Sequence, residues 1–163
     1  MSASSFRIEP AHQHDLPLIL RFIKDLAAYE KLSDEVVATE DALRRFLFGP
    51  APAAEVIIGY TGEEPVGFAL FFQSFSTFLG RPGLYLEDLF VLPQWRGRGF
   101  GRRLLVHVAG IAVDRGYGRM EWSVLDWNKL ALRLYSRIGA QPMNEWTVHR
   151  LTGDKLRQLA TER

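Results

Sequence analysis

Apolar residues recur at every third or fourth position in several stretches of the chain, and this spacing predicts amphipathic helices. In the first stretch, from about Leu16 to Leu32, Asp15 can cap the N-terminus and Pro17 fits the first turn. A second helix is expected from Thr39 to Phe48, because Gly49-Pro50 then stops it. Three further helices are expected at Gly97–Arg115, Asn128–Ile138 and Asp154–Thr161.

Short apolar runs rich in β-branched and aromatic residues predict strands between these helices. They are expected at Phe6–Ile8, Glu55–Thr61, Val66–Ser76, Leu84–Leu92, Met120–Leu125 and Trp146–Leu151. The strands cluster in the middle of the chain, and helices separate the later ones. This order indicates an α+β sandwich around a mixed sheet. We see no repeat, linker or low-complexity tract, so a single domain over residues 1–163 is expected.

Composition excludes several classes of function. The formal net charge of +1 gives no general reason to expect nucleic acid or an anionic membrane as a partner. The chain has no cysteine, which excludes disulfides, a cysteine nucleophile and a Cys-ligated metal. The four histidines show no paired ligand spacing, so no metal is expected. No signal peptide is visible, and no stretch approaches the ~18 apolar residues of a membrane helix. A soluble, cytoplasmic protein is therefore expected.

A glycine-rich turn follows the Leu84–Leu92 strand and opens the next helix. Free N–H groups at such a helix start form an anion site, which the helix dipole assists. Glycines let the backbone approach a phosphate closely. Four of the chain's arginines fall within eight residues here and add positive charge: Arg96, Arg98, Arg102 and Arg103. This segment predicts a phosphate site, although a glycine turn with solvated arginines is the alternative.

The glycine spacing distinguishes between kinds of phosphate loop. A Walker loop needs Lys-Ser or Lys-Thr after its last glycine, and none follows here. A dinucleotide fingerprint would need a third glycine where Arg102 stands. The spacing Gln94-x-x-Gly97-x-Gly99 instead resembles the acetyl-CoA pyrophosphate loop of the GNAT acetyltransferase superfamily.

Other segments extend this resemblance over residues 6–151. Asn128, Ala131, Tyr135 and Gly139-Ala140 follow the order that is typical of the superfamily after the loop helix. The segments Lys24–Glu30, Tyr85–Val91 and Val124–Asn128 resemble the diamine acetyltransferase branch, which includes the spermidine/spermine and thialysine N-acetyltransferases. The resemblance implies a GNAT fold with six to seven strands, splayed strands that form the acetyl-CoA cleft, and a homodimer.

The resemblance also implies roles for two residues in the transfer of acetyl to a primary amine. An alkylammonium with a pKa near ~10.4 must lose a proton before it attacks a thioester, and Glu87 matches the family's base. A salt-bridged strand-edge carboxylate is the alternative for Glu87. Tyr135 matches the family's general acid for the departing thiolate, although its spacing from Ala131 also suits a core aromatic.

Binding residues follow from the same resemblance. Those expected at acetyl-CoA are Leu89, Phe90, Val91, Arg96, Gly97, Arg98, Gly99, Phe100, Gly101, Arg102, Asn128, Ala131 and Tyr135. Those expected at the acceptor amine are Tyr29, Glu30, Glu87, Glu121 and Trp122. Asn128 is also expected to cap its helix. Polyamine acetyltransferases carry acidic residues where this chain has Thr77 and either Asn144 or Glu145. A shorter amine or a lysine-like amino acid is therefore the favoured acceptor.

Three other functions stay open at this point. A GNAT enzyme could act on a protein or peptide amino group, since the cofactor loop does not distinguish acceptors. A non-catalytic acyl-CoA sensor would not need Glu87 and Tyr135. Nucleic-acid binding through Arg96–Arg103 would need a larger basic surface with interleaved aromatic residues. The favoured function is acetyl-CoA-dependent N-acetylation of a small amine.

Overall fold

The computed structural model describes residues 6–163. Five strands form one sheet in the order β1-β2-β3-β4-β5. Neighbouring strands are antiparallel except β4 and β5, which are parallel. The strands are β1 (Phe6–Pro10), β2 (Glu55–Thr61), β3 (Glu64–Ser76), β4 (Arg81–Val91) and β5 (Met120–Trp122). The helices are α1 (Leu16–Tyr29), α2 (Glu40–Phe48), α3 (Phe100–Asp114), α4 (Lys129–Arg137) and α5 (Gly153–Ala160). Short 3-10 turns lie at Gln13–Asp15, Ser33–Glu35 and Pro93–Trp95.

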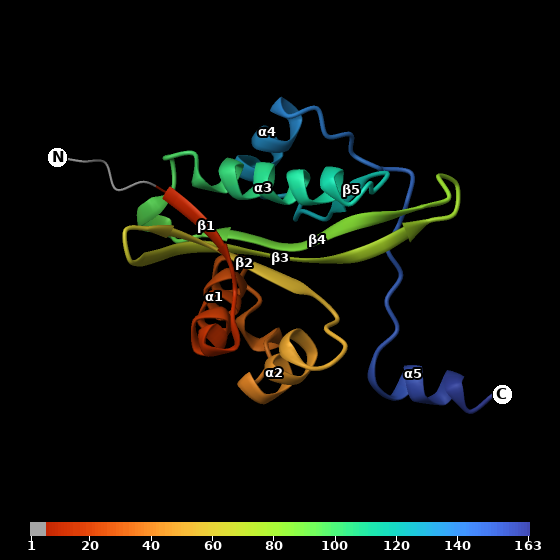
Figure 1. Ribbon diagram of the computed structural model, residues 1–163. Helices are drawn as coiled ribbons and strands as arrows, with labels where there is room; N and C mark the ends of the chain where they lie inside the picture. The colour runs from red at the N-terminus through yellow and green to blue at the C-terminus, as the bar shows by residue number, and fades with distance from the viewer. Residues whose placement is uncertain (1–5) are drawn as a thin grey trace. The chain divides into compact units, whose positions relative to one another are not determined.

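The chain divides into two compact units, one up to Trp127 and one from Asn128 to Arg163. The whole sheet belongs to the first unit, with α3 on one of its faces and α1 and α2 on the other (Figure 1). This sandwich confirms the expected mixed α+β architecture. The single domain expected from the sequence stays a prediction.

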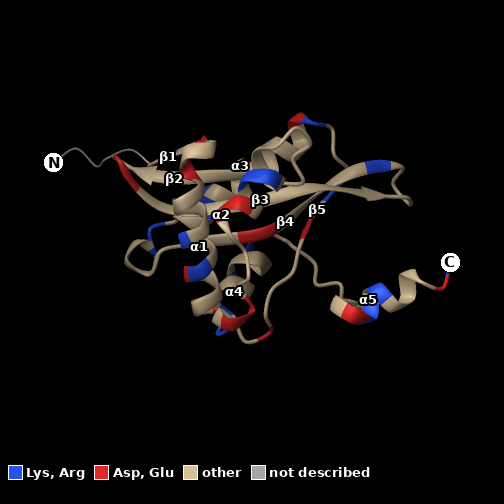
Figure 2. Ribbon diagram, turned by 90° about the horizontal axis from the view of Figure 1, so that it is seen from below, with Lys and Arg blue, Asp and Glu red and all other residues tan. Residues whose placement is uncertain are grey.

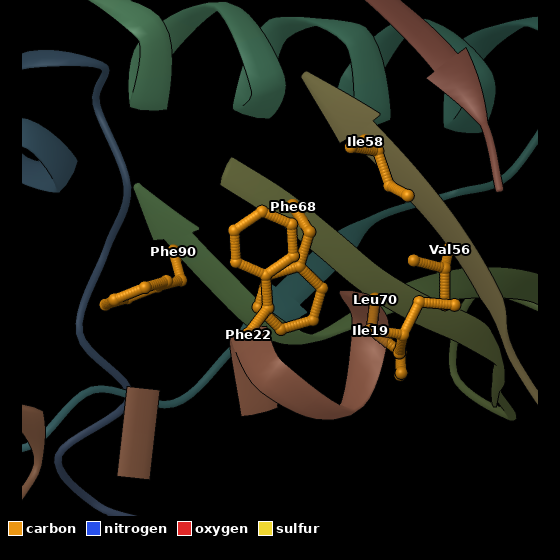
Figure 3. Close-up of a cluster of buried hydrophobic side chains, with 7 residues drawn as sticks. All are labelled: Ile19, Phe22, Val56, Ile58, Phe68, Leu70 and Phe90. Atoms are coloured by element: carbon orange, nitrogen blue, oxygen red, sulfur yellow. The ribbon is translucent and has the colours of Figure 1, made fainter. Parts of the chain in front are cut away.

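The core between α1 and the sheet explains in part why β2 and β3 are rich in apolar residues. Ile19 and Phe22 of α1 pack with residues from three strands, namely Val56, Ile58, Phe68, Leu70 and Phe90 (Figure 3). The rings of Phe22 and Phe68 stack at 5.2 Å between centroids. Alternate residues such as Ile57 and Ala69 are also buried, because α3 covers the other face of the sheet. Both faces of the central strands are therefore apolar.

A bulge interrupts β4 next to the candidate site. Leu86 lies opposite Phe71 and Asp88 lies opposite Leu70, so Glu87 is an extra residue without a partner in β3. Along an unbroken strand, Leu86, Asp88 and Phe90 would share one face. In the structure, Asp88 and Phe90 share the α1 face with Leu70, whereas Leu86 lies on the α3 face. The extra residue at the bulge reverses the alternation.

Three expected elements differ from the structure. The sheet has five strands rather than six to seven, and residues 146–151 form none of them. The apolar side chains of that segment are exposed, with 72% of Trp146 and 81% of Val148 accessible. A strand needs a partner edge, and an alternating sequence does not supply one. The third difference is that β5 ends at Trp122, opposite Leu86, where the β4 bulge begins.

The helix after the glycine turn begins at Phe100 rather than Gly97. Gly97 and Gly99 have φ angles of 77° and 81°, which a right-handed helix cannot contain. Among residues 6–163, no helix is long and apolar enough to cross a membrane.

Candidate active site

The glycine turn presents open backbone at the start of α3. Gly99 is the N-cap of this helix and provides no side-chain cap for its first amides. A Cβ added at Gly97 or Gly99 would meet nothing within 4 Å, so both residues face open space. A 15-residue helix also directs its positive dipole end toward this turn. The turn therefore fits a phosphate group, as its sequence predicts.

The four arginines do not act together at this turn. Arg96 donates from Nε to the carbonyl of Val91 at 2.9 Å. Arg103 donates to the carbonyl of Phe6 at 3.1 Å and lies over the ring of that residue. Arg98 and Arg102 are exposed, and Arg98 stacks 4.6 Å from the ring centre of Trp95. Two of the arginines, Arg96 and Arg103, thus bind backbone carbonyls, whereas the exposed Arg98 and Arg102 are placed to meet a phosphate at the turn.

Phe100 and Gly101 occupy the first turn of α3. The ring of Phe100 stacks on Phe6 at 4.4 Å, nearly parallel. A Cβ at Gly101 would make only an ordinary contact with Val91 at 3.7 Å. Both residues can therefore offer backbone N–H groups to a ligand, while the Phe100 side chain packs inside the unit.

The last five residues of β4 have an open edge. The ladder between β4 and β5 covers Leu84–Leu86 and stops, while β4 continues to Val91. Among the strands that the structure describes, only β3 pairs with residues 87–91. Backbone groups on the other edge need partners, which amides of a bound ligand can supply. The expected contact residues Leu89, Phe90 and Val91 lie on this stretch, and the Val91 carbonyl already accepts a hydrogen bond from Arg96.

Carboxylates gather where the β4 bulge meets the end of α1. Burial first, and then the nearby charges of Glu87 and Glu30, together raise the pKa of Asp88 to about 7. Burial also raises the pKa of Glu30. Figure 2 marks the acidic segment of β4 in red. Glu87, the bulged residue, is exposed. A carboxylate group of this kind stabilises a cation and can take a proton near neutral pH.

The sequence analysis did not select Asp88, although it lies next to the selected Glu87. The adjacent pair Glu87-Asp88 in an apolar strand was a usable signal, because two neighbouring acids cannot both avoid the core in a regular strand. The bulge resolves this conflict by leaving Glu87 exposed while Asp88 turns toward the α1 face.

Aromatic rings and cations line the other side of the α1 terminus. The ring of Tyr29 lies 5.7 Å from that of Trp127. The guanidinium of Arg96 lies 4.3 Å from the ring centre of Tyr29 and 5.3 Å from that of Phe90. The Lys31 ammonium lies 5.5 Å from the ring centre of Trp127. Arg96 therefore connects the glycine turn with the predicted acceptor residue Tyr29.

The two acceptor candidates on β5 lie opposite the paired part of β4, before the bulge. Glu121 lies opposite Tyr85 and forms an ion pair with Arg119 at 2.9 Å. Trp122 lies opposite Leu86 and is partly buried. Glu121 is thus already neutralised by a neighbour, and its role at the acceptor stays a prediction.

The second unit carries three further candidates on or next to α4. Asn128 is its N-cap and accepts a hydrogen bond from the backbone N–H of Ala131 at 3.2 Å, which confirms its expected capping role. Tyr135 lies one turn beyond Ala131 and is partly buried. The cofactor contacts of all three and the acid role of Tyr135 stay predictions.

Comparisons with known proteins agree with this arrangement. A model of the acetyltransferase (GNAT) family matches residues 21–140. Thialysine N-epsilon-acetyltransferase from Bos taurus is 40% identical over 164 residues, covering 94% of this chain and 96% of that protein. L-ornithine N5-acetyltransferase from Arabidopsis thaliana is 33% identical over 198 residues, covering 94% of this chain and 87% of that protein.

Solved structures resemble the chain over nearly its full length. An integron cassette protein from V. cholerae has a TM-score of 0.80 at 28% identity and covers 96% of this chain and 98% of that one. An aminoglycoside acetyltransferase from an uncultured soil metagenomic sample has a TM-score of 0.74 at 19% identity, covers 91% of this chain and 95% of that one, and shows the fold alone.

Proposed function

The chain belongs to the GNAT family of acetyltransferases, and on that premise we propose that it acetylates the primary amine of a small cationic acceptor at the β4 bulge. The acetyl donor is acetyl-CoA. The observation that carries this proposal is the group of three carboxylates at the β4 bulge. Glu87 and Asp88 lie on the strand that leads into the glycine turn, and Glu30 lies at the end of α1.

Binding of acetyl-CoA is supported by two features of the first unit. The amides at the start of α3, with the exposed Arg98 and Arg102, suit its pyrophosphate. The open edge of β4 from Leu89 to Val91 suits the amides of its pantetheine arm. A ligand held at both places would lie beside the Glu87–Asp88 pair, because all of these residues belong to one continuous segment.

The acceptor nitrogen loses two protons, one before it attacks and one as the tetrahedral intermediate collapses; one proton reaches the sulfur and the other passes to solvent. Glu87 takes a proton from the ammonium, directly or through a water, and the free amine then attacks the thioester carbonyl carbon. As the carbon–sulfur bond breaks, the Tyr135 hydroxyl donates to the thiolate, whose parent thiol has a pKa near ~8.5. Asp88 and Glu30 stabilise the cationic acceptor before it loses its proton.

The names of the relatives support a small basic acceptor. The Bos taurus and Arabidopsis thaliana proteins are named for thialysine and L-ornithine, and both cover nearly the whole of this chain. A protein or peptide amino group is the second candidate within the family. The partly buried carboxyl groups of Asp88 and Glu30 favour a small cation, because a compact ammonium gains most from partly desolvated charges.

An acceptor screen tests the proposal. Free CoA would be followed after mixing acetyl-CoA with diamines, polyamines, basic amino acids and peptides. We expect release with a small amine and none with peptides. Release with peptides alone would contradict the small acceptor. Thermal shift with CoA, NAD and ATP tests the donor site, since a ligand at 100 times its Kd adds about 2.7 kcal/mol to stability. A response to NAD or ATP alone would contradict acetyl-CoA as donor.

We also propose a cytoplasmic homodimer. The exposed Trp146, Val148 and Leu151 support association, because apolar surface of this kind is more stable when covered. Light scattering that gives a monomer at micromolar concentration would contradict the dimer.

A further inference from the structure

Lys31 has a backbone conformation that normally belongs to glycine. Its φ angle is 62°, and among residues 6–163 it is the only non-glycine residue with a positive φ. The cause is the way α1 ends. The N–H of Leu32 donates to Ala27 at 2.8 Å and that of Lys31 to Ala28 at 3.2 Å, which places Lys31 in the left-handed region.

Glycine would be easier to accommodate at this position. A left-handed conformation is unfavourable for a residue with a Cβ, and seven glycines among residues 6–163 adopt it elsewhere. Lysine at this position therefore lowers stability unless its side chain makes a compensating contact. Its contact with the Trp127 ring, at 5.5 Å, is weak at an exposed site. Stability alone does not account for lysine here.

The position of the Lys31 ammonium suggests what it provides. Its contact ring, Trp127, also touches Tyr29, the candidate acceptor residue. The three consecutive residues Tyr29, Glu30 and Lys31 thus place an aromatic ring, a carboxylate and an ammonium at one helix end. Within the described residues no carboxylate forms an ion pair with Lys31. An anionic group of a ligand could pair with it.

The charges around the α1 terminus are therefore of two kinds. Glu30, Glu87 and Asp88 suit the amine end of an acceptor. Lys31 suits an anionic group at another point of the same molecule, and it repels a second ammonium. A diamine would satisfy only the carboxylates, whereas a basic amino acid would satisfy both kinds of charge. Repulsion of the wrong ligand is a common source of specificity.

We propose that Lys31 binds the carboxylate of the acceptor and thereby selects basic amino acids over diamines. This inference rests on the proposed function, since it requires that small amines are acetylated at this site. It assigns a specificity role to a residue that the sequence analysis did not select.

Two pairs of acceptors isolate the carboxylate. Ornithine differs from putrescine, and lysine from cadaverine, only by the carboxylate group. The measurement is kcat/KM for each acceptor at saturating acetyl-CoA, for the wild type and for Lys31→Gly. We expect the ornithine-to-putrescine ratio to fall about tenfold in the variant, as for the loss of one charged hydrogen bond. The lysine-to-cadaverine ratio should fall in parallel.

Matched variants separate this role from a structural one. Lys31→Gly should melt no lower than the wild type, because its φ angle suits glycine. Lys31→Asn, which also tolerates the left-handed region, repeats the test if the glycine variant is poorly folded. Lys31→Arg should keep the wild-type ratio because it keeps the cation. Lys24→Gln removes another exposed ammonium from α1 and should not alter the ratio.

The outcomes distinguish the two proposals. If the wild type acetylates ornithine and all four variants keep its acceptor ratio, the role of Lys31 is wrong while the proposed function stands. If Lys31→Arg loses discrimination as fully as Lys31→Gly, a carboxylate contact is also excluded. If the wild type releases CoA with neither ornithine nor putrescine nor their longer homologues, the proposed acceptor class fails and the inference fails with it.

Discussion

The two halves of β4 differ although they belong to one strand. From Arg81 to Leu86 the strand pairs with β3, and its last three residues, Leu84–Leu86, pair with β5 as well. The buried side chains of Leu84 and Leu86 belong to the core. From Glu87 to Val91 it pairs only with β3 and carries two carboxylates. The bulge at Glu87 separates these halves. Where a strand pairs on both edges, its backbone groups are used within the sheet. Where it pairs on one edge, the backbone groups of the other edge can bind a ligand.

The largest expected effect is on stability, in the fully paired half. Leu86 is 2% exposed and lies between Phe71 and Trp122. Leu86→Ala should lower the free energy of unfolding by about 3 kcal/mol, because it leaves a cavity. Leu89→Ala, in the partly exposed half, is the matched control and should cost clearly less. Urea unfolding of both variants checks this, and equal losses would remove the distinction between the halves.

The next effect concerns activity in the open half. Glu87→Gln keeps the shape of the side chain and removes the proposed base, so kcat/KM should fall about 10²-fold at low pH. The loss should shrink as the pH approaches the acceptor's own pKa, because solvent then deprotonates the amine. The unfolding free energy of this variant should change little, since Glu87 is exposed.

A pH profile of kcat/KM for the wild type and Glu87→Gln checks this prediction. Wild-type rates at every pH would refute Glu87 as the base. Asp88 would then be the next candidate, because its pKa of about 7 also suits proton transfer.

The proposed acid can be tested independently of β4. Tyr135→Phe keeps the ring on α4 and removes the hydroxyl, so kcat should fall about 10²-fold while acetyl-CoA still binds. Calorimetric titration with CoA and single-turnover rates provide the measurement. Its pH profile should lack the rescue at high pH that is expected for Glu87→Gln. An unchanged kcat would show that the Tyr135 hydroxyl is not the acid.

The smallest effect comes from Asp88 and depends on pH. Its pKa in the folded protein is about 7, above the ordinary value of 3.8. Between these values the folded protein holds a proton that the unfolded chain has lost, so the stability of the wild type falls as pH rises through this window. Asp88→Asn should therefore be more stable than the wild type by about 2 kcal/mol at pH 8. Each unit of pKa shift corresponds to ~1.4 kcal/mol, and solvent around the partly exposed side chain reduces the total.

Denaturant unfolding of Asp88→Asn and the wild type at pH 4 and pH 8 checks this. The stability difference should be much smaller at pH 4, because the folded Asp88 is protonated there and the unfolded one, with its ordinary pKa of 3.8, is partly protonated too. An equal stability difference at pH 4 and pH 8 would show that Asp88 does not cause the pH dependence of stability. Leu86→Ala is the control, since its cost should not depend on pH.

Much of the fold could be predicted because its signals are local. Thr39 caps α2 by accepting a hydrogen bond from the N–H of Ala42 at 3.2 Å, close to where the sequence starts that helix. The bounds of β2 agree with the expected ones, since β-branched residues and the following Gly62 define them. The glycine turn was also found, since φ angles of 77° and 81° require glycine.

The candidate site was predicted less completely. The sequence identified Glu87, Tyr29 and Glu30, which the structure places around one end of α1. It grouped four arginines by their spacing, whereas Arg96 and Arg103 are engaged with Val91 and Phe6. It passed over Asp88 and Lys31. Their properties come from burial and from a backbone conformation, neither of which a residue type reveals.

By itself, the sequence determined the helices, the central strands and the glycine turn, because capping, periodicity and glycine preference act between near neighbours. Its motifs also identified the family. Only the tertiary structure decided the bulge at Glu87, the end of β5, the division of the arginines and the raised pKa of Asp88. Each of these depends on a partner far along the chain: Leu70 and Phe71 for the bulge, Tyr29 for Arg96, and Glu30 for Asp88. The register of a sheet and the desolvation of a charge follow from packing, which no local pattern specifies.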